Sequence, residues 1–138
     1  MNRPSPGSSS QRRWIVLPAV VLTACDAVLT LLFQPSSYWS GDFATAHEIS
    51  PLGAATLQLH PMAFGAFMFA WACVIVLVAF RLKEPWNRVW VLMIVIGHSA
   101  GAFDWLEDLS YLGALPSFFA AALVTVFCWR KGDPAPGR

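Results

Sequence analysis

Four long apolar stretches constrain the fold more than any other feature of this sequence. A helix that spans a membrane needs about 20 mostly apolar residues. Four stretches reach or approach that length, and they cover residues 14–33, 61–80, 89–106 and 111–129. None of them alternates between apolar and polar residues as the strands of a membrane barrel do. We therefore predict an all-α integral membrane protein, a bundle of four transmembrane helices.

The composition supports this prediction and excludes other classes of protein. Hydrophobic residues make up 57% of the 138 residues and charged residues 12%, whereas soluble domains carry roughly 25% charged residues. Such a chain is too apolar to be intrinsically disordered. The net charge of +1 gives no electrostatic reason to expect a nucleic-acid partner.

The positions of the basic residues predict the orientation of the bundle. All nine lysines and arginines lie before the first stretch, between the second and third, or after the fourth: Arg3, Arg12, Arg13, Arg81, Lys83, Arg88, Arg130, Lys131 and Arg138. The connections 34–60 and 107–110 contain none. Because cytoplasmic loops are rich in Lys and Arg, we expect both termini to be cytoplasmic. A bacterial inner membrane is the expected location.

The remaining segments are expected to lie outside the bilayer. We predict that residues 1–13 and 132–138 are cytoplasmic tails without regular structure, so that the transmembrane domain covers 14–131. In the long connection, Ser50 and Pro51 have the residue types of a helix N-cap and first helical position. They predict a short interfacial helix that continues into the second span with a kink at Pro61.

Cys25 allows an alternative processing of the chain. The sequence pattern of a bacterial lipoprotein cleavage site is present at Leu22-Thr23-Ala24-Cys25, and it follows two arginines and a short apolar run. Cleavage there would leave a lipidated Cys25 as the first residue. The apolar run continues to residue 33, so we expect the first span to be retained in the mature protein.

Three ionisable residues lie inside the predicted spans, namely Asp26, His98 and Asp104. Such residues are costly in a membrane and usually face the interior of a bundle, where they find a partner. Thr30 lies one helical turn from Asp26 on the same face. For Asp26 we expect hydrogen-bond partners among Thr30, His98, Ser99 and the segment of Glu48. We expect His98 to face the interior rather than lipid.

Further carboxylates and histidines follow in the two connections on the outer side: Asp42, His47, Glu48, His60, Glu107 and Asp108. The outer mouth of the bundle should therefore be acidic and contain histidine. His47 and His60 are weak candidates for metal ligands, because no pair of these residues has the spacing of a known metal site. His60 and His98 lie at different depths, which disfavours a bis-histidine haem. We predict no cofactor.

Small residues on the third and fourth spans predict close helix packing. Gly97 and Gly101 form a GxxxG motif on the third span, and small residues recur every four positions on the fourth: Gly113, Ser117, Ala121 and Thr125. Such stripes let helix backbones approach closely. They fit either packing within one bundle or a contact with a second copy or another membrane protein.

Two short motifs carry a resemblance to a known group of proteins. The motifs are Asp26-Ala-Val-Leu-Thr30 on the first span and Glu48-Ile-Ser-Pro51 before the second. They resemble small uncharacterised bacterial multi-spanning membrane proteins with Asp-x-x-x-Thr and Glu-x-Asn-Pro at these places. Ser50 stands where that pattern has Asn, and both residue types cap helices. The resemblance covers about residues 20–80, and it implies an architecture rather than a reaction.

Two hypotheses for function follow from these residues. The first is a non-enzymatic binding or interaction module in the membrane, with an acidic, histidine-bearing outer mouth. The second is an intramembrane enzyme or an ion or proton carrier that uses Asp26, Glu48, His98 and Asp104. The sequence contains no nucleophile–base signature, phosphate-binding loop or metal motif, so we favour the first hypothesis.

Overall fold

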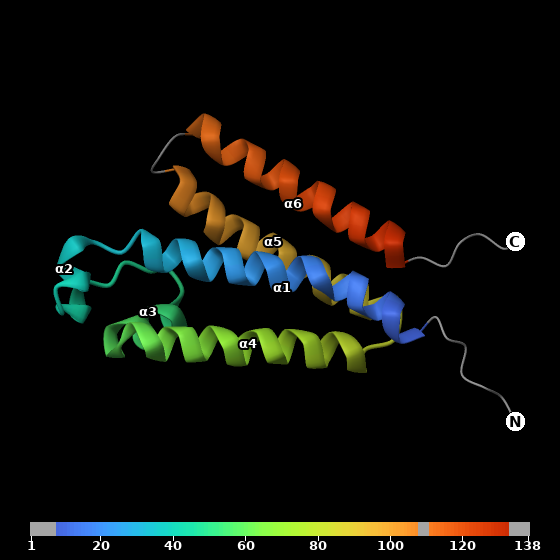
Figure 1. The fold of residues 1–138 in the computed structure, drawn as a ribbon, viewed down its shortest axis with the longest axis horizontal. Helices are drawn as coiled ribbons and strands as arrows, with labels where there is room; N and C mark the ends of the chain where they lie inside the picture. Colours follow the sequence, from blue (N-terminus) through green and yellow to red (C-terminus); the bar gives the residue numbers. More distant parts are fainter. Residues whose placement is uncertain (1–7, 108–110, 133–138) are drawn as a thin grey trace, which may run out of the picture.

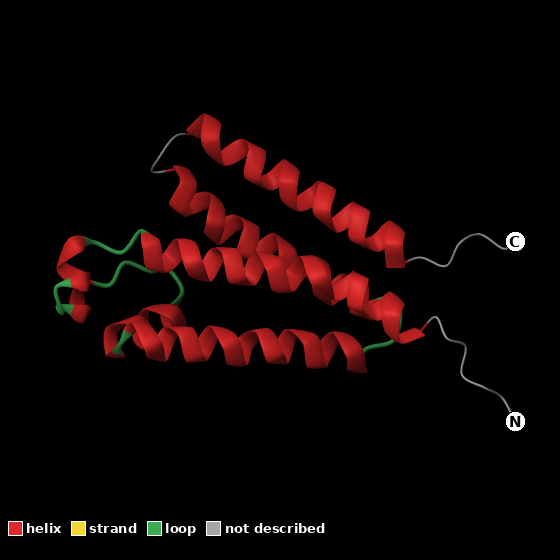
Figure 2. Cartoon of the chain, in the orientation of Figure 1, coloured by secondary structure: helices red, strands yellow, loops and turns green. Residues whose placement is uncertain are grey.

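The computed structural model describes residues 8–107 and 111–132, although the side chains of 8–11, 107, 111–118 and 132 are not described. The described residues form helices and loops, with no strand among them (Figure 2). The elements, with a 3₁₀ helix labelled η1, are α1 (Ser8–Leu32), α2 (Ser36–Trp39), η1 (Phe43–Thr45), α3 (Pro51–Leu59), α4 (Pro61–Arg81), α5 (Trp86–Glu107) and α6 (Tyr111–Gly132).

Helix α1 is the centre of the fold, because it contacts each of the other long helices. Helices α4 and α6 lie on opposite sides of α1, and α5 packs against all three (Figure 1). The short elements α2, η1 and α3 gather at one end of the long helices (Figure 1). The basic residues of the described chain lie towards the opposite end, where α1 begins, α4 meets α5 and α6 ends.

Two separate clusters of buried apolar residues hold the helices together. The larger cluster joins α1, α4 and α5 towards the basic end: Ile15, Val16, Ala19, Ile75, Ala79, Val91, Ile94 and Val95. The smaller one, at the other end, consists of Tyr38, Leu57 and Phe64. There the Tyr38 hydroxyl donates to the Leu57 carbonyl oxygen at 3.2 Å. The space between the two clusters is where the polar residues of the first and third predicted spans meet.

Three helical segments are long and apolar enough to cross a membrane, each with 21 residues: Arg12–Leu32, Pro61–Arg81 and Trp86–Leu106. Large apolar side chains lie on their outer surface, such as Leu32, Phe69 and Met93, which are 69%, 73% and 64% exposed. Several polar side chains are instead buried: Thr23, Thr30, Gln34, Asn87, Ser99 and Thr125. This arrangement reverses that of soluble proteins and indicates a membrane protein.

The first helix begins earlier than predicted, so the expectation of an irregular segment up to residue 13 is wrong for residues 8–13. These residues belong to α1. Part of the reason is a tertiary contact, because the Arg12 guanidinium donates a hydrogen bond to the Phe80 carbonyl oxygen near the end of α4. Residues 1–7 and 133–138, also predicted as tails, lie outside the described residues.

The short helix before the second span is confirmed as α3. The Ser50 hydroxyl accepts a hydrogen bond from the Gly53 N–H at 3.2 Å, as expected of an N-cap. However, α3 does not continue into α4. His60 is fully extended, with φ −178° and ψ 147°, and α4 begins anew at Pro61. The residue before a proline avoids helical angles. One helix therefore ends at Leu59 and another begins at Pro61, instead of a single kinked helix. The two short elements α2 and η1 were not predicted.

Candidate functional site

A cavity of about 660 Å³ opens between α1, α3, α4 and α5. One wall is apolar and mostly aromatic or sulfur-bearing: Phe64, Phe67, Met68, Trp71, Met93 and Ile94. The other wall is polar and includes all five residues selected from the sequence as a candidate intramembrane site: Asp26, Thr30, Glu48, His98 and Asp104. These residues come from α1, α5 and the loop before α3, so only the folded bundle brings them together.

Asp26 ends a chain of hydrogen bonds that crosses three helices. The Trp71 indole N–H on α4 donates to His98 Nε2 on α5 at 3.2 Å. His98 Nδ1 lies 2.7 Å from Asp26 Oδ2 on α1. Both side chains are mostly enclosed, at 15% and 16% exposed. His98 therefore faces the interior, where it is one of the partners expected for Asp26.

Trp71 fixes the orientation of the His98 ring. An indole N–H can only donate a hydrogen bond, so Trp71 donates to His98 Nε2 and the other ring nitrogen, Nδ1, is directed at the Asp26 carboxylate. The ring is thereby held between α4 and α1, with an indole on one side and a carboxylate on the other.

A second set of hydrogen bonds lies near Glu48. The Trp105 indole N–H on α5 donates to Thr30 Oγ1 on α1 at 3.0 Å, and the Ser50 N–H donates to Glu48 Oε1 at 2.8 Å. Thr30 and Glu48 both line the cavity. An oriented donor such as the Ser50 N–H stabilises a carboxylate as its acceptor.

Gln34 holds the segment that carries Glu48 against the end of α1. Its side-chain amide donates to the carbonyl oxygens of Thr30 and His47, both at 2.8 Å. Its oxygen accepts from the His47 N–H at 2.8 Å. With Gln34 only 6% exposed, these three bonds fix the position of the loop next to the cavity.

The surroundings of Glu48 oppose its ionisation. Burial raises the pKa of Glu48 above its ordinary value, and the negative charge of Asp26 raises this pKa further. The hydrogen bond from Ser50 and the neighbouring Thr30 hydroxyl act in the opposite direction and lower it. Burial is the larger of the two causes that raise this pKa. A bound cation would favour the charged form of a carboxyl group in such a partly dehydrated site.

Two glycines make room for the two carboxylates. A Cβ atom on Gly101 would lie 2.8 Å from Asp26 Oδ1, and one on Gly53 would lie 2.9 Å from Glu48 Cγ. Gly101 packs against the Asp26 side chain of α1, while a Cβ on Gly97 would meet nothing within 4 Å. Close packing between helix backbones at Gly97 and Gly101 stays a prediction. Ala121 is buried on α6, whereas the side chains at Gly113 and Ser117 lie outside the described residues.

The other candidates lie around the site without forming a metal centre. Asp104 is exposed and lines the cavity. His47 packs edge-on against Trp105, with ring centroids 5.4 Å apart. His60 Nδ1 accepts from the Met62 N–H and caps α4. No group of three or more metal-ligating side chains gathers within the described ranges. Cys25 is exposed on α1, which continues to Leu32.

The sequence analysis missed four residues that organise the site: Trp71, Trp105, Gln34 and Gly53. One available signal was the position of Trp71 in the middle of an apolar stretch, because a buried indole N–H needs an acceptor. Trp105 lies near the end of the third predicted span, where tryptophan is common because of the membrane interface and does not by itself indicate a polar partner. Gln34 and Gly53 act through tertiary contacts that no local pattern displays.

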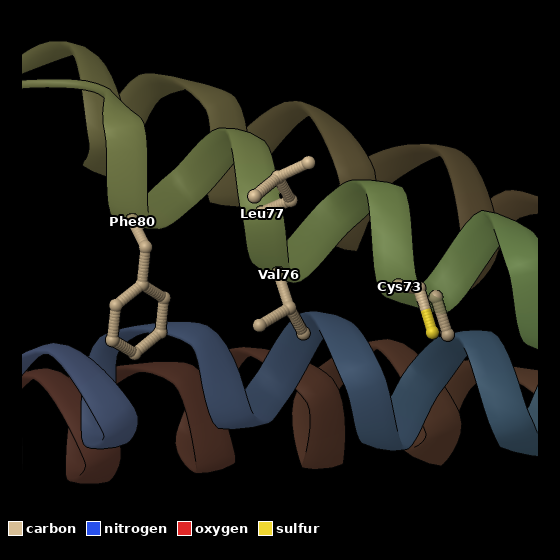
Figure 3. A pocket seen from close by; sticks show the side chains of 5 residues that line it. Cys73, Val76, Leu77 and Phe80 are labelled. Atoms are coloured by element: carbon tan, nitrogen blue, oxygen red, sulfur yellow. The ribbon is translucent and has the colours of Figure 1, made fainter.

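A second hollow lies on α4, with a volume of about 590 Å³ and only apolar lining: Ala72, Cys73, Val76, Leu77 and Phe80. Figure 3 shows Cys73, Val76 and Phe80 directed from α4 towards α1. Since it has no charged or hydrogen-bonding side chain in its lining, this hollow offers nothing that would orient a ligand.

The fold and the cavity define an all-helical protein that has three apolar helices of membrane-spanning length and a carboxylate-lined site between them. No protein-family model, curated protein or solved structure matches the chain.

Proposed function

We propose that this chain is a four-span integral membrane protein that binds a small ligand in the cavity between α1, α3, α4 and α5, without catalysing a reaction. The observation that carries the proposal is the combination of an apolar lining with two carboxylates, Asp26 and Glu48, each of which is hydrogen-bonded to the protein. Binding sites for small molecules are typically apolar pockets with a few well-placed polar groups.

His98 supports binding over catalysis. A general base must have a free nitrogen within reach of a substrate proton. His98 Nε2 instead accepts from Trp71, and Nδ1 faces Asp26. Both ring nitrogens are therefore committed to protein partners that lock the ring in place.

A proton carrier is the second candidate, and the raised pKa of Glu48 beside Asp26 favours it. Its path would run from exposed Asp104 through Glu48 and Asp26 to His98. In proteoliposomes that contain a pH-sensitive dye, a carrier would dissipate an imposed pH gradient. Asp26→Asn would abolish this flux. A rate no higher than that of protein-free liposomes would exclude the carrier and leave the binding function.

The proposed orientation places both termini in the cytoplasm and the cavity in the outer half of a bacterial inner membrane. Helix α6, with 22 residues, would be the fourth span. The lysine and arginine distribution supports this orientation. The resemblance to small bacterial membrane proteins also stays a proposal. Four of its five motif positions, Asp26, Thr30, Glu48 and Ser50, line the cavity, and the fifth, Pro51, does not.

Reporter fusions test the orientation directly. Alkaline phosphatase fused after Leu59 or after Ser110 should be active, because both points would lie outside the cytoplasm. A fusion after Lys83 should be inactive, and a green fluorescent protein fused there should fluoresce. Phosphatase activity after Lys83 combined with inactivity after Leu59 would mean that the bundle is inserted in the reverse direction.

A cavity-filling variant tests the binding function. Gly97 lines the cavity and has open space beside it, so Gly97→Trp should fill the site without a clash in the helix bundle. Native mass spectrometry of protein released from its own membrane should show a bound small molecule in the wild type and none in Gly97→Trp.

The matched control is Gly65→Trp on α4, where the Cβ position is equally open and the residue does not line the cavity. This variant should keep the bound molecule. If the same adduct appeared in all three proteins, or if the wild type carried none, the proposed function would be refuted.

A further inference from the structure

We propose that the ligand of this cavity is a cationic amphiphile, with an ammonium group at Asp26 and Glu48 and an apolar chain along the opposite wall. This inference rests on the proposed binding function and specifies the chemical class of the ligand. It follows from three features of the cavity: its charge, its aromatic lining and its opening.

The lining of the cavity is rich in carboxylates and poor in basic side chains. Three carboxylates line it, from Asp26, Glu48 and Asp104, and its described lining contains no lysine or arginine. The sequence has no lysine or arginine between residues 89 and 129 either. Its one histidine, His98, already contacts Asp26. Carboxylates in a partly dehydrated site are stabilised by a cation.

The Asp26 carboxylate has unused capacity to accept hydrogen bonds. An ionised carboxylate offers about four acceptor positions. Among the described residues, the hydrogen-bond partner of the Asp26 side chain is His98, whose Nδ1 contacts Oδ2. A primary ammonium carries three donors, so it could hydrogen-bond to Asp26 and still have donors for a second carboxylate of the lining.

The aromatic and thioether side chains suit the rest of such a molecule. Phe67 and Trp71 line the cavity beside the acidic wall, and aromatic faces attract ammonium groups. Met68, Met93 and Ile94 extend the apolar wall, where flexible methionine side chains adapt to an alkyl chain. A phospholipid head would instead bring a phosphate, for which this lining has no cationic partner.

The opening of the cavity lies on a surface that would face lipid. Met93, Gly97 and Ala100 line the cavity from α5 and are exposed, and Gly97 has nothing within 4 Å of its Cβ position. An amphiphile dissolved in the outer leaflet would therefore enter sideways past Gly97, head group first, without leaving the membrane.

Three probes of equal chain length test the proposed class, namely n-octylamine, n-octanol and octanoate. The purified full chain is placed in phosphatidylcholine nanodiscs and titrated by calorimetry, with empty nanodiscs as the blank. Octylamine should bind at least about tenfold more tightly than octanol or octanoate, as expected for one charge-assisted hydrogen-bonded contact. Glu48→Gln should reduce octylamine affinity by about tenfold and leave octanol affinity unchanged.

Two further variants keep the test decisive. Asp104→Asn removes an exposed carboxylate of the cavity and should weaken octylamine binding even where Glu48→Gln fails to fold. Asp42→Asn removes an exposed carboxylate that does not line the cavity, so it should have no effect on either probe.

The outcomes separate the class of ligand from the binding function itself. Equal affinities for octylamine and octanol, both lost in Gly97→Trp, would overturn the cationic class and preserve the binding site. Octylamine binding that survives in Glu48→Gln, Asp104→Asn and Gly97→Trp alike would place the cation elsewhere and overturn the inference. No binding of any probe, together with no native adduct, would refute the proposed function as well.

Discussion

Asp26→Leu should abolish cation binding while leaving the bundle folded. In the wild type, the carboxylate accepts from His98 Nδ1 at 2.7 Å. Leucine leaves this N–H without its partner, at a cost of about 1–3 kcal/mol. The same substitution removes a carboxylate from an apolar helix. Insertion scales give the cost of placing a carboxylate at the centre of a membrane helix as roughly 2.5–3.5 kcal/mol. The two effects oppose each other, so the net change in stability should be small.

Asp26→Asn separates the charge from the hydrogen bond. The asparagine amide oxygen still accepts from His98, so thermal unfolding in detergent should match that of the wild type. Octylamine affinity should nevertheless fall by about tenfold or more, because the charge of the carboxylate is gone. Calorimetry and melting curves on the same preparations measure both quantities. Unchanged octylamine affinity and unchanged melting in both Asp26 variants would show that Asp26 has neither a structural nor a binding role.

Gly101→Ala should separate Asp26 from His98 without altering either residue. The new Cβ would lie 3.2 Å from Asp26 Oδ2 and 2.8 Å from Oδ1. The shorter of these distances is closer than real Cβ atoms approach, so the carboxylate must move. Its short bond to His98 would then lengthen or break. Hydrogen bonds to charged groups contribute about 1.5–3 kcal/mol, so the free energy of unfolding should fall by roughly 1–3 kcal/mol.

Gly97→Ala is the matched control, one helical turn earlier on the same helix. Its Cβ position is open, and alanine favours a helix over glycine by up to ~1 kcal/mol. Gly97→Ala should therefore melt at the wild-type temperature or slightly above it. Nitrogen-15 NMR of the His98 ring should change in Gly101→Ala alone. Equal melting temperatures for the two variants, with identical His98 spectra, would contradict the contact between Gly101 and Asp26.

The long apolar helices could be predicted from the sequence because prolines and charged residues mark their ends. The second predicted span, 61–80, differs from α4 by one residue, since Pro61 can begin a helix but not continue one. The N-terminal boundary was less accurate. Arg12 was expected outside the membrane helix, and its bond to the Phe80 carbonyl is a contact over 68 residues that no local pattern displays.

The ionisable residues inside the predicted spans, Asp26, His98 and Asp104, could be selected because each is expensive in an apolar helix. That argument identifies which residues need partners but not which partners they find. Trp71 and Trp105 donate hydrogen bonds to His98 and Thr30, yet tryptophan is compatible with an apolar helix and gives no sign that it needs a polar partner. The contact between Gly101 and Asp26 was equally hidden, because a GxxxG spacing looks the same whether a helix or a carboxylate packs against it.

The distance along the chain between Asp26 and His98 has a consequence for biosynthesis. The two residues are 72 positions apart, and Trp71 lies between them. The ribosome therefore synthesises α1 before Trp71 and His98 exist. Until α5 follows, the Asp26 carboxylate lacks the hydrogen-bond partner that it has in the folded bundle, and the apolar residues of α1 must outweigh its cost in the membrane on their own. The arrival of α5 then supplies that partner.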